Sequence, residues 1–248
     1  MNTAVCTALD GAQVAITSDR PLTTDYSSVA QARITALGIP SQGFSTGPLS
    51  FAEELATDPA LIKDVSFIEE YSYQRGRLRI ATGTQPVGPD GAEYWDVGPD
   101  GSMRPMPLHV AVWEGKGRSL RTHLYGGEAA DLLVILEQFE IAERPRGLTC
   151  IPRDPEQASF VEGPSIIKDV PGFALLEIFQ LSARTARTLP RHAGTTVSGG
   201  ELFVDGVGTS RIHLLLVGES AVTWIVPELS ASELDLLDGV SRLEVKWS

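Results

Sequence analysis

Two short, mostly apolar runs mark the beginning of the chain. They cover residues 3–9 and 12–18, and Asp10-Gly11 separates them, so this part predicts a β-hairpin with Asp10-Gly11 as its turn. Residues 66–82 are also predicted to be extended. The stretch 82–104 is rich in Gly, Pro and Asp and predicts a hairpin that projects from the body of the protein.

Three helices are predicted between these extended segments. The first covers residues 27–37 and ends at Gly38, a residue type common at helix C-termini. The second is short and follows a capping box made by Ser50 and Glu53. The third has Pro59 in its first turn.

The most informative pattern is an internal repeat. One block starts at Glu93 and the other at Glu201, and both run strand, strand, strand, helix, strand. The second strand of each block begins with a histidine, His109 in the first and His213 in the second. The two blocks therefore predict two copies of one substructure.

Each block has a helix with an apolar stripe. The first helix begins near Glu128, extends its stripe to Phe139 and is predicted to end in the segment 144–147. The second begins after Ser230, which forms a capping box with Glu233, and ends at Gly239. Its inward-facing residues are predicted to be Leu234 and Leu237.

A helix on one face of an antiparallel sheet is an α+β arrangement. The sequence thus predicts an α+β fold of two pseudo-symmetric halves, each an antiparallel sheet with helices packed on one face. Residues 1–64 form the N-terminal hairpin and helices, 65–155 the first repeat and 156–248 the second, all in one compact unit. Segment 170–190 fits either a buried strand or a helix and is interpreted as mostly helical.

Composition narrows the possible partners. The chain has 248 residues, of which 42% are hydrophobic and 21% charged, as in ordinary globular proteins. It carries 20 basic and 32 acidic residues and a formal net charge of −12, which disfavours nucleic acid and anionic membrane surfaces. The two cysteines, Cys6 and Cys150, lie in apolar contexts and are predicted to be buried, reduced thiols. With no signal peptide or membrane span apparent, a cytoplasmic location is expected.

Motifs for catalysis are not evident. The segment 115–119 has the letters of a phosphate-binding loop without its spacing, and it is interpreted as a hairpin turn. The histidines are too widely separated to predict a metal site, and no cofactor is predicted. Glu69 and Glu70 could supply a carboxylate for acid–base chemistry, although adjacent strand residues point to opposite faces. The catalytic residues, if there are any, stay unknown.

Five residues are candidates for binding a partner. Tyr94 and Trp95 lie on the predicted projecting hairpin, and such aromatic residues are enriched in interface hot spots. The alternative is that they belong to a core strand. Arg184, Arg187 and Arg191 form a basic run in an acidic chain and could receive carboxylates. The alternative is that they only neutralise nearby acidic surface.

The order of elements resembles that of the EspG chaperones of type VII (ESX) secretion. The similar stretches are the predicted helix ending with residues 34–38, the helical pair that follows to Ile62, and the strand-turn-strand-helix of residues 210–239. The resemblance implies an acidic cytosolic protein with two quasi-symmetric α+β halves that holds secreted substrates in solution. The N-terminal hairpin departs from this pattern, and no functional residue can be matched.

The sequence therefore predicts a non-catalytic bacterial protein of chaperone, adaptor or immunity type that binds another protein, such as a secreted one, in the cytoplasm. One alternative is an enzyme or small-molecule-binding protein that uses a crevice between the two halves and the two repeat-related histidines. Another is a phage or structural assembly subunit.

Overall fold

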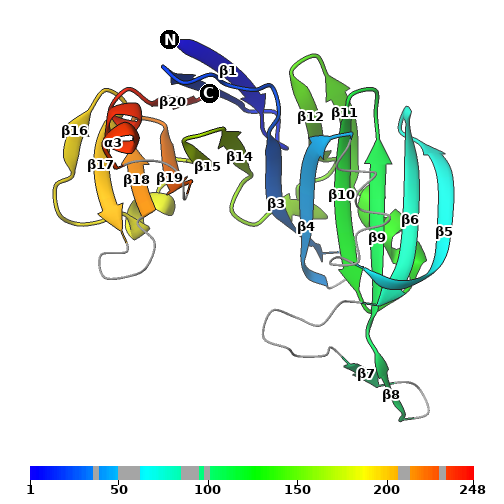
Figure 1. Cartoon of the computed structure of the whole chain (residues 1–248). Helices are drawn as coiled ribbons and strands as arrows, with labels where there is room; N and C mark the ends of the chain where they lie inside the picture. The colour runs from blue at the N-terminus through cyan, green and yellow to red at the C-terminus, as the bar shows by residue number, and fades with distance from the viewer. Residues whose placement is uncertain (36–38, 50–61, 85–94, 98–100, 206–212, 229–232) are drawn as a thin grey trace. The chain divides into compact units, whose positions relative to one another are not determined.

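The computed structural model describes residues 1–35, 39–49, 62–84, 95–97, 101–205, 213–228 and 233–248 (Figure 1). The chain forms two compact units. The first consists of residues 1–29 and 163–248, and the second of residues 30–162.

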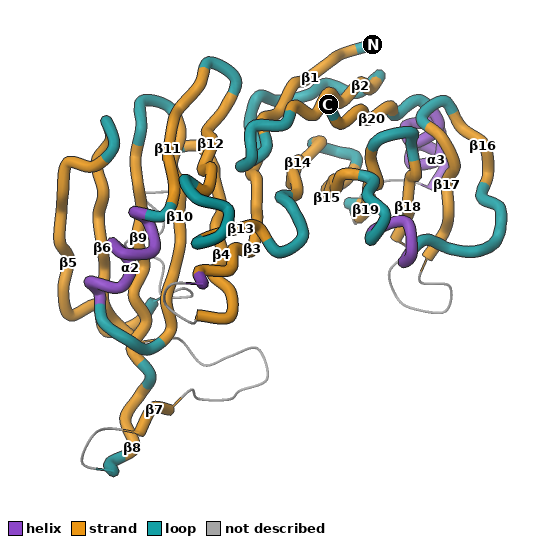
Figure 2. The backbone as a smooth tube through the Cα atoms, turned by 180° about the vertical axis from the view of Figure 1, so that it is seen from behind, coloured by secondary structure: helices purple, strands orange, loops and turns teal. Residues whose placement is uncertain are grey.

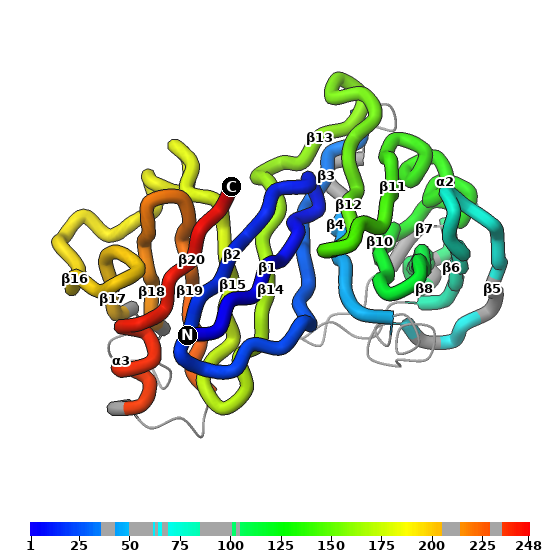
Figure 3. Tube along the Cα trace, turned by 90° about the horizontal axis from the view of Figure 1, so that it is seen from above, coloured from blue at the N-terminus to red at the C-terminus, as the bar shows by residue number. Residues whose placement is uncertain are grey.

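The first unit is built from two β-layers. The smaller layer has the order β1 (Asn2–Thr7), β2 (Gln13–Ser18), β20 (Glu244–Trp247). The larger layer has the order β16 (Thr195–Val197), β17 (Gly200–Asp205), β18 (His213–Val217), β19 (Ala221–Pro227), β15 (Ala174–Gln180), β14 (Ser165–Val170). Figure 3 shows β1, β2 and β20 lying over β14, β15 and β19. Apolar side chains from both layers, such as Ile16 and Leu176, form one core.

Helix α3 (Glu233–Ser241) completes the first unit. Its residue Gly239 lies so close to Phe173 that a Cβ atom there would be 2.6 Å from the ring. The helix buries Leu236 and Val240 in the same core. Glycine is therefore used inside this helix to let it approach a buried aromatic ring.

The second unit contains a larger antiparallel sheet. Its strands have the order β4 (Ile39–Pro48), β10 (Arg118–Tyr125), β9 (Pro107–Glu114), β6 (Gly76–Thr84), β5 (Lys63–Tyr73). Strand β3 (Ser27–Ile34) precedes β4; it pairs at its start with β14 and at its end with β13 (Ala158–Phe160). In the described part of the chain, the hydrogen-bonded path through β3 has 12 strands, and β13, which pairs with β3 beside this path, is the thirteenth.

One face of this sheet is covered by a helix and a hairpin. Helix α2 (Ala129–Glu137) contacts β9 (Figure 2), and the hairpin of β11 (Phe139–Arg144) and β12 (Gly147–Pro152) follows it. In β9, every residue after Pro107 is buried, so both faces of this central strand are covered. Phe139 anchors the hairpin, since its ring centroid lies 4.8 Å from that of Phe44 on β4.

The fold is mainly β, with 57% of the residues in strands, and the α+β prediction is wrong. The predicted repeat also has two different topologies. In the first block, β7 (Trp95–Val97) pairs with β8 (Met103–Pro105) in a separate two-stranded sheet, whereas β17 pairs with β16 and β18. After the helices, β11 pairs with β12, but β20 pairs with β2. The two blocks are alike in composition, not in strand pairing.

Two segments predicted as helix are strands. Residues 27–34 form β3, in which Ser28, Ala30, Ala32 and Ile34 are buried in alternation, a period of two that fits a sheet. Segment 170–190 contains the end of β14, all of β15 and a short 3₁₀ helix, η2 (Thr185–Thr188). In both cases burial between neighbouring strands outweighed local helix signals. The helices predicted at Ser50 and Pro59 lie outside the described residues.

The observed ends of α2 and α3 differ from the predicted ones. Glu128 and Asp131 form a capping box at the start of α2, but the helix ends at Glu137, and Phe139 begins β11. Helix α3 continues through Gly239, and Leu237 is exposed rather than inward-facing. Ser230 and the side chain of Leu234 lie outside the described residues.

Several local predictions are confirmed. The N-terminal hairpin is β1–β2, the extended segment 66–82 lies in β5 and β6, and the strands starting at His109 and His213 are β9 and β18. The hairpin predicted within residues 82–104 is β7–β8, which projects from the sheet of its unit (Figure 1). Cys6 and Cys150 are buried and are not joined in a disulfide, and burial raises the pKa of the Cys150 thiol far above its usual range.

A buried carboxylate on β9 predicts acid sensitivity. Glu114 accepts hydrogen bonds from Arg77 and Arg79 on β6, with Arg77 Nε 2.9 Å from Oε2. Burial raises the pKa of Glu114, but these two guanidinium groups outweigh it and hold the pKa below its ordinary value of 4.5. A carboxyl group with a lowered folded-state pKa stabilises the fold above its unfolded-state pKa, and this contribution is lost as the pH falls through the folded-state pKa.

We therefore expect Glu114→Gln to lower the free energy of unfolding at pH 7. The difference from the wild type should begin to shrink as the pH falls through about 4.5, where Glu114 of the unfolded chain becomes protonated, and should be lost as the pH falls through the lower pKa of the folded state. Urea denaturation at neutral and acidic pH measures both values. A difference that stays constant over this range would contradict the assigned role of the ion pair.

Candidate functional site

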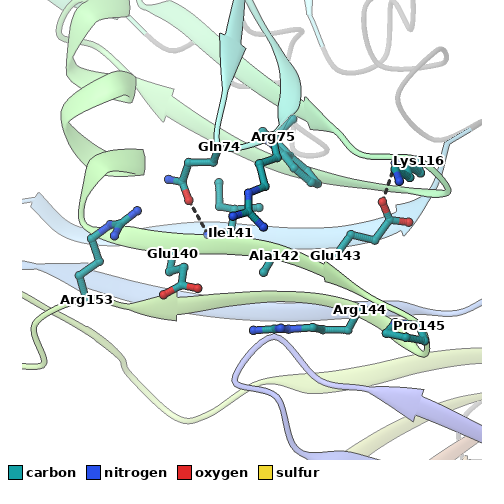
Figure 4. A pocket seen from close by; sticks show the side chains of 11 residues that line it. Gln74, Arg75, Lys116, Glu140, Ile141, Ala142, Glu143, Arg144, Pro145 and Arg153 are labelled. Carbon is teal, nitrogen blue, oxygen red and sulfur yellow. Dashed lines mark hydrogen bonds between the residues drawn. The ribbon is translucent and has the colours of Figure 1, made fainter.

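A groove of about 790 Å³ opens in the second unit where the β5–β6 turn, the β9–β10 turn and strand β11 meet (Figure 4). Its lining residues come from these three elements, from the end of β9, from the β11–β12 turn and from the residue that follows β12. They are Gln74, Arg75, Trp113, Lys116, Glu140, Ile141, Ala142, Glu143, Arg144, Pro145 and Arg153.

The β5–β6 turn contributes two residues in an unusual conformation. Tyr73 pairs with Gly76 across a two-residue turn, in which Gln74 has φ 46° and Arg75 has φ 64°. Tight hairpin turns need such positive φ values, but Asn and Gly usually supply them. A side chain with a Cβ in this region costs roughly 1–2 kcal/mol per residue. Strain of this kind concentrates at functional sites, so the turn points to a role for its two side chains.

Gln74 connects this turn to β11. Its side-chain Nε2 donates to the Phe139 carbonyl at 2.9 Å, and the Ile141 backbone N–H donates to its Oε1 at 2.8 Å. One side-chain amide thus makes the two hydrogen bonds that the N–H and the C=O of one residue in a neighbouring parallel strand would make. This double hydrogen bond fixes one end of β11 in the groove.

Glu143 connects the other end of β11 to the β9–β10 turn. Its carboxylate accepts hydrogen bonds from the backbone N–H groups of Lys116 and Gly117. A Cβ atom on Gly115 would lie 2.3 Å from Glu143 Oε2, so a side chain at this position would have to displace the carboxylate. Because both carboxylate oxygens are already bound, Glu143 serves mainly to hold the hairpin in place.

Trp113 lies between the two turns. Its indole N–H donates to the Tyr73 carbonyl at 2.8 Å, and only 2% of its surface is exposed. A Cβ atom on Gly76 would lie 2.3 Å from the ring, so the glycine at the start of β6 makes room for the indole. The groove therefore has a rigid aromatic wall.

The groove is richer in cations than in free carboxylates. Arg75, Lys116 and Arg144 are exposed, and their side chains form no ion pair or hydrogen bond with the residues that the structure describes. Arg153 donates one hydrogen bond, from Nε to the Phe139 carbonyl at 3.2 Å. Opposite charge comes from Glu140 and from the already bound Glu143. In a chain with a net charge of −12, these residues form a local excess of positive charge, which attracts anionic groups.

Replacing Arg75 tests whether this residue is needed for stability, given that its backbone has a positive φ. Asn tolerates the left-handed region better than Arg, so Arg75→Asn is expected to keep or raise the free energy of unfolding, by up to about 1 kcal/mol. The same change removes one cation from the groove. Urea denaturation measures the change in stability. A loss of stability would show that Arg75 has a structural role.

The predicted partner-binding residues lie elsewhere. Arg184, Arg187 and Arg191 are exposed on the segment between β15 and β16 in the first unit, where η2 replaces the predicted longer helix. Trp95 lies on β7; its side chain and Tyr94 are outside the described residues. The described members of this set do not line the groove. Their binding role stays a prediction.

The two repeat-related histidines belong to different units. His109 is buried, with Nδ1 2.9 Å from the Thr82 hydroxyl and Nε2 3.3 Å from the Gly127 carbonyl, so it is a packed and hydrogen-bonded core residue. The side chain of His213 lies outside the described residues. In the described ranges, no three His, Cys, Asp or Glu residues are grouped to hold a metal ion. No helix in those ranges is long and apolar enough to cross a membrane.

No family model matches the chain, and neither curated proteins nor solved structures give a match.

Sequence reasoning missed this groove because its parts are distant in the chain. Gln74 and Ile141 are 67 residues apart, and Lys116 and Glu143 are 27 apart. One local signal was available. Gln74-Arg75 stands at a tight turn between two extended runs, where Asn-Gly would be the unstrained choice.

Proposed function

We propose that this chain is a non-catalytic protein-binding protein, of the chaperone, adaptor or immunity type, and that its groove receives an acidic segment of a partner protein. The observation that carries the proposal is the set of three cations, Arg75, Lys116 and Arg144, that surround the groove without an ion pair to described residues. Guanidinium groups are well suited to carboxylates, because they donate two parallel hydrogen bonds.

The rigid construction of the groove supports the same proposal. Gln74 and Glu143 fix β11 at two points, so the cations are presented on a frame held by hydrogen bonds. A preorganised site loses less conformational entropy when a ligand binds. Internal symmetry gives the proposal no support, since the two sequence blocks differ in strand pairing.

A charge-reversal comparison tests the proposal. The probe is a pool of fluorescein-labelled heptapeptides with Asp or Glu at alternate positions, and binding is measured by fluorescence anisotropy. We expect Arg75→Glu/Arg144→Glu to weaken binding by about tenfold or more, because two attractive contacts become repulsive. The matched control is Arg184→Glu/Arg187→Glu, which changes the net charge equally on an exposed segment of the first unit.

The outcomes distinguish binding in the groove from binding at the arginines of the first unit. Loss in the groove variant with retention in the control supports the groove. Equal loss in both variants would show that the pool responds to net charge alone, and loss only in the control would move the site to the arginines of the first unit. Either result, or no binding of the pool to the wild type, would overturn the proposal.

A further inference from the structure

We infer that the acidic segment binds as an added β-strand along the open edge of β11, an inference that rests on the proposed function. Three features lie side by side at this edge. The Gln74 amide is already hydrogen-bonded to it, the next pair of backbone groups is open, and Arg75 and Arg144 line the same groove.

The hydrogen bonds of Gln74 show which backbone groups of β11 point away from β12. Strand β11 pairs with β12 on one side, with Arg144 opposite Gly147 across a two-residue turn. The Phe139 carbonyl and the Ile141 N–H both bind Gln74, so they face the other side. Because N–H and C=O directions alternate along a strand, the Ile141 carbonyl and the Glu143 N–H face the same way.

The next position along this edge is open. The Gln74 amide accepts from one N–H and donates to the carbonyl two residues earlier. One residue of an added parallel strand, shifted by two residues or roughly 7 Å along β11, would accept from the Glu143 N–H with its C=O and donate its own N–H to the Ile141 carbonyl. Neither of these two groups has a hydrogen bond to another described residue beyond its own hairpin. Unpaired edge groups of this kind are what an added strand binds.

Pro145 limits the length of the added strand. Proline has no N–H, so the ladder cannot continue past it. The edge therefore offers one complete position and the Glu143 carbonyl, between Gln74 at one end and the hairpin tip at the other. A short extended segment fits this edge in a single register.

Charge identifies the class of segment. Figure 4 shows the Arg75 side chain extending from its turn toward β11, between Gln74 and Lys116. An Asp or Glu side chain on the added strand would meet this guanidinium group, and Arg144 flanks the same stretch. The ligand is thus a short acidic peptide segment in extended conformation, recognised by its backbone as well as by its charge.

Two measurements test the inference with the acidic heptapeptide pool. In the first, a fully N-methylated pool keeps the charges but has no backbone N–H, and we expect it to bind at least about tenfold more weakly. In the second, hydrogen exchange of the protein is followed by NMR. The Glu143 amide should be protected about tenfold on binding, whereas the Ile141 amide, already bound to Gln74, serves as the control and should change little.

The results separate this inference from the proposed function. If the N-methylated pool binds as well as the parent pool and Arg75→Glu/Arg144→Glu still abolishes binding, the groove binds anionic peptides and the added strand is wrong. If Glu143 exchange does not slow while peptide is bound, the added strand is also wrong. If neither pool binds, both proposals fail.

Discussion

Replacing Phe139 by alanine is expected to lower the free energy of unfolding by about 3–5 kcal/mol, the usual range for a fully buried phenylalanine. Phe139 is fully buried and packs between Phe44 and Phe160, with ring centroids 4.8 and 6.1 Å away. Its loss would leave a cavity beneath the first residue of β11. Since Gln74 binds the backbone of this residue, the groove should lose its shape as well.

Urea denaturation followed by circular dichroism measures the change. Phe139→Leu keeps most of the apolar volume and should lose much less stability. A surface control is Leu175→Ala on β15, where the leucine is 43% exposed and the expected change is within about 0.5 kcal/mol. Similar losses for Phe139→Ala and Leu175→Ala would mean that the aromatic cluster is not a main support of the second unit.

Adding one methyl group at Gly76 is expected to cost about 1–3 kcal/mol, the range for overpacking a well-packed region. The new Cβ atom would lie 2.3 Å from the Trp113 ring, so the indole must move. Its hydrogen bond to the Tyr73 carbonyl would be strained or lost. Gly76 is not at a positive φ, so this cost is steric and does not come from the backbone.

The control for Gly76→Ala is Gly117→Ala in the neighbouring turn. There the nearest atom to a new Cβ is Glu143 Oε1 at 3.3 Å, on a flexible side chain that can yield. We expect Gly76→Ala to lower the urea midpoint clearly more than Gly117→Ala does. It should also change the near-ultraviolet circular dichroism, because Trp113 leaves its fixed position. Equal midpoints would contradict the close contact between Gly76 and Trp113.

Pattern alone was sufficient where an element is stabilised by its own neighbours in sequence. The β1–β2 hairpin follows from two short, mostly apolar runs on either side of Asp10-Gly11, and the start of α2 follows from acidic residues at Glu128 and Asp131. The local sequence pattern was misleading for β3 and β15, because these strands are stabilised by pairing with strands far away in the chain. Ser27–Val29 pair with residues 165–167, a partner that no local window contains.

The groove depends on the same long-range pairing. Its two fixing contacts, from Gln74 to β11 and from Glu143 to the β9–β10 turn, join segments that approach only after the sheet has formed. The apparent repeat shows the converse. The strands that follow Glu93 and Glu201 have similar apolar sequences but pair with different neighbours. The composition of a strand determines how much of it can be buried, but not which strand it pairs with.

The sequence by itself determined an acidic globular chain with buried thiols, a set of local hairpins and the N-terminal cap of α2, because each depends on composition or on residues a few positions apart. The tertiary structure alone decided that β3 and β15 are strands, and that Gln74, Arg75 and Glu143 meet around β11. The physical reason is that backbone hydrogen bonds between distant strands, and the burial they allow, outweigh local preferences of about 1 kcal/mol or less per residue.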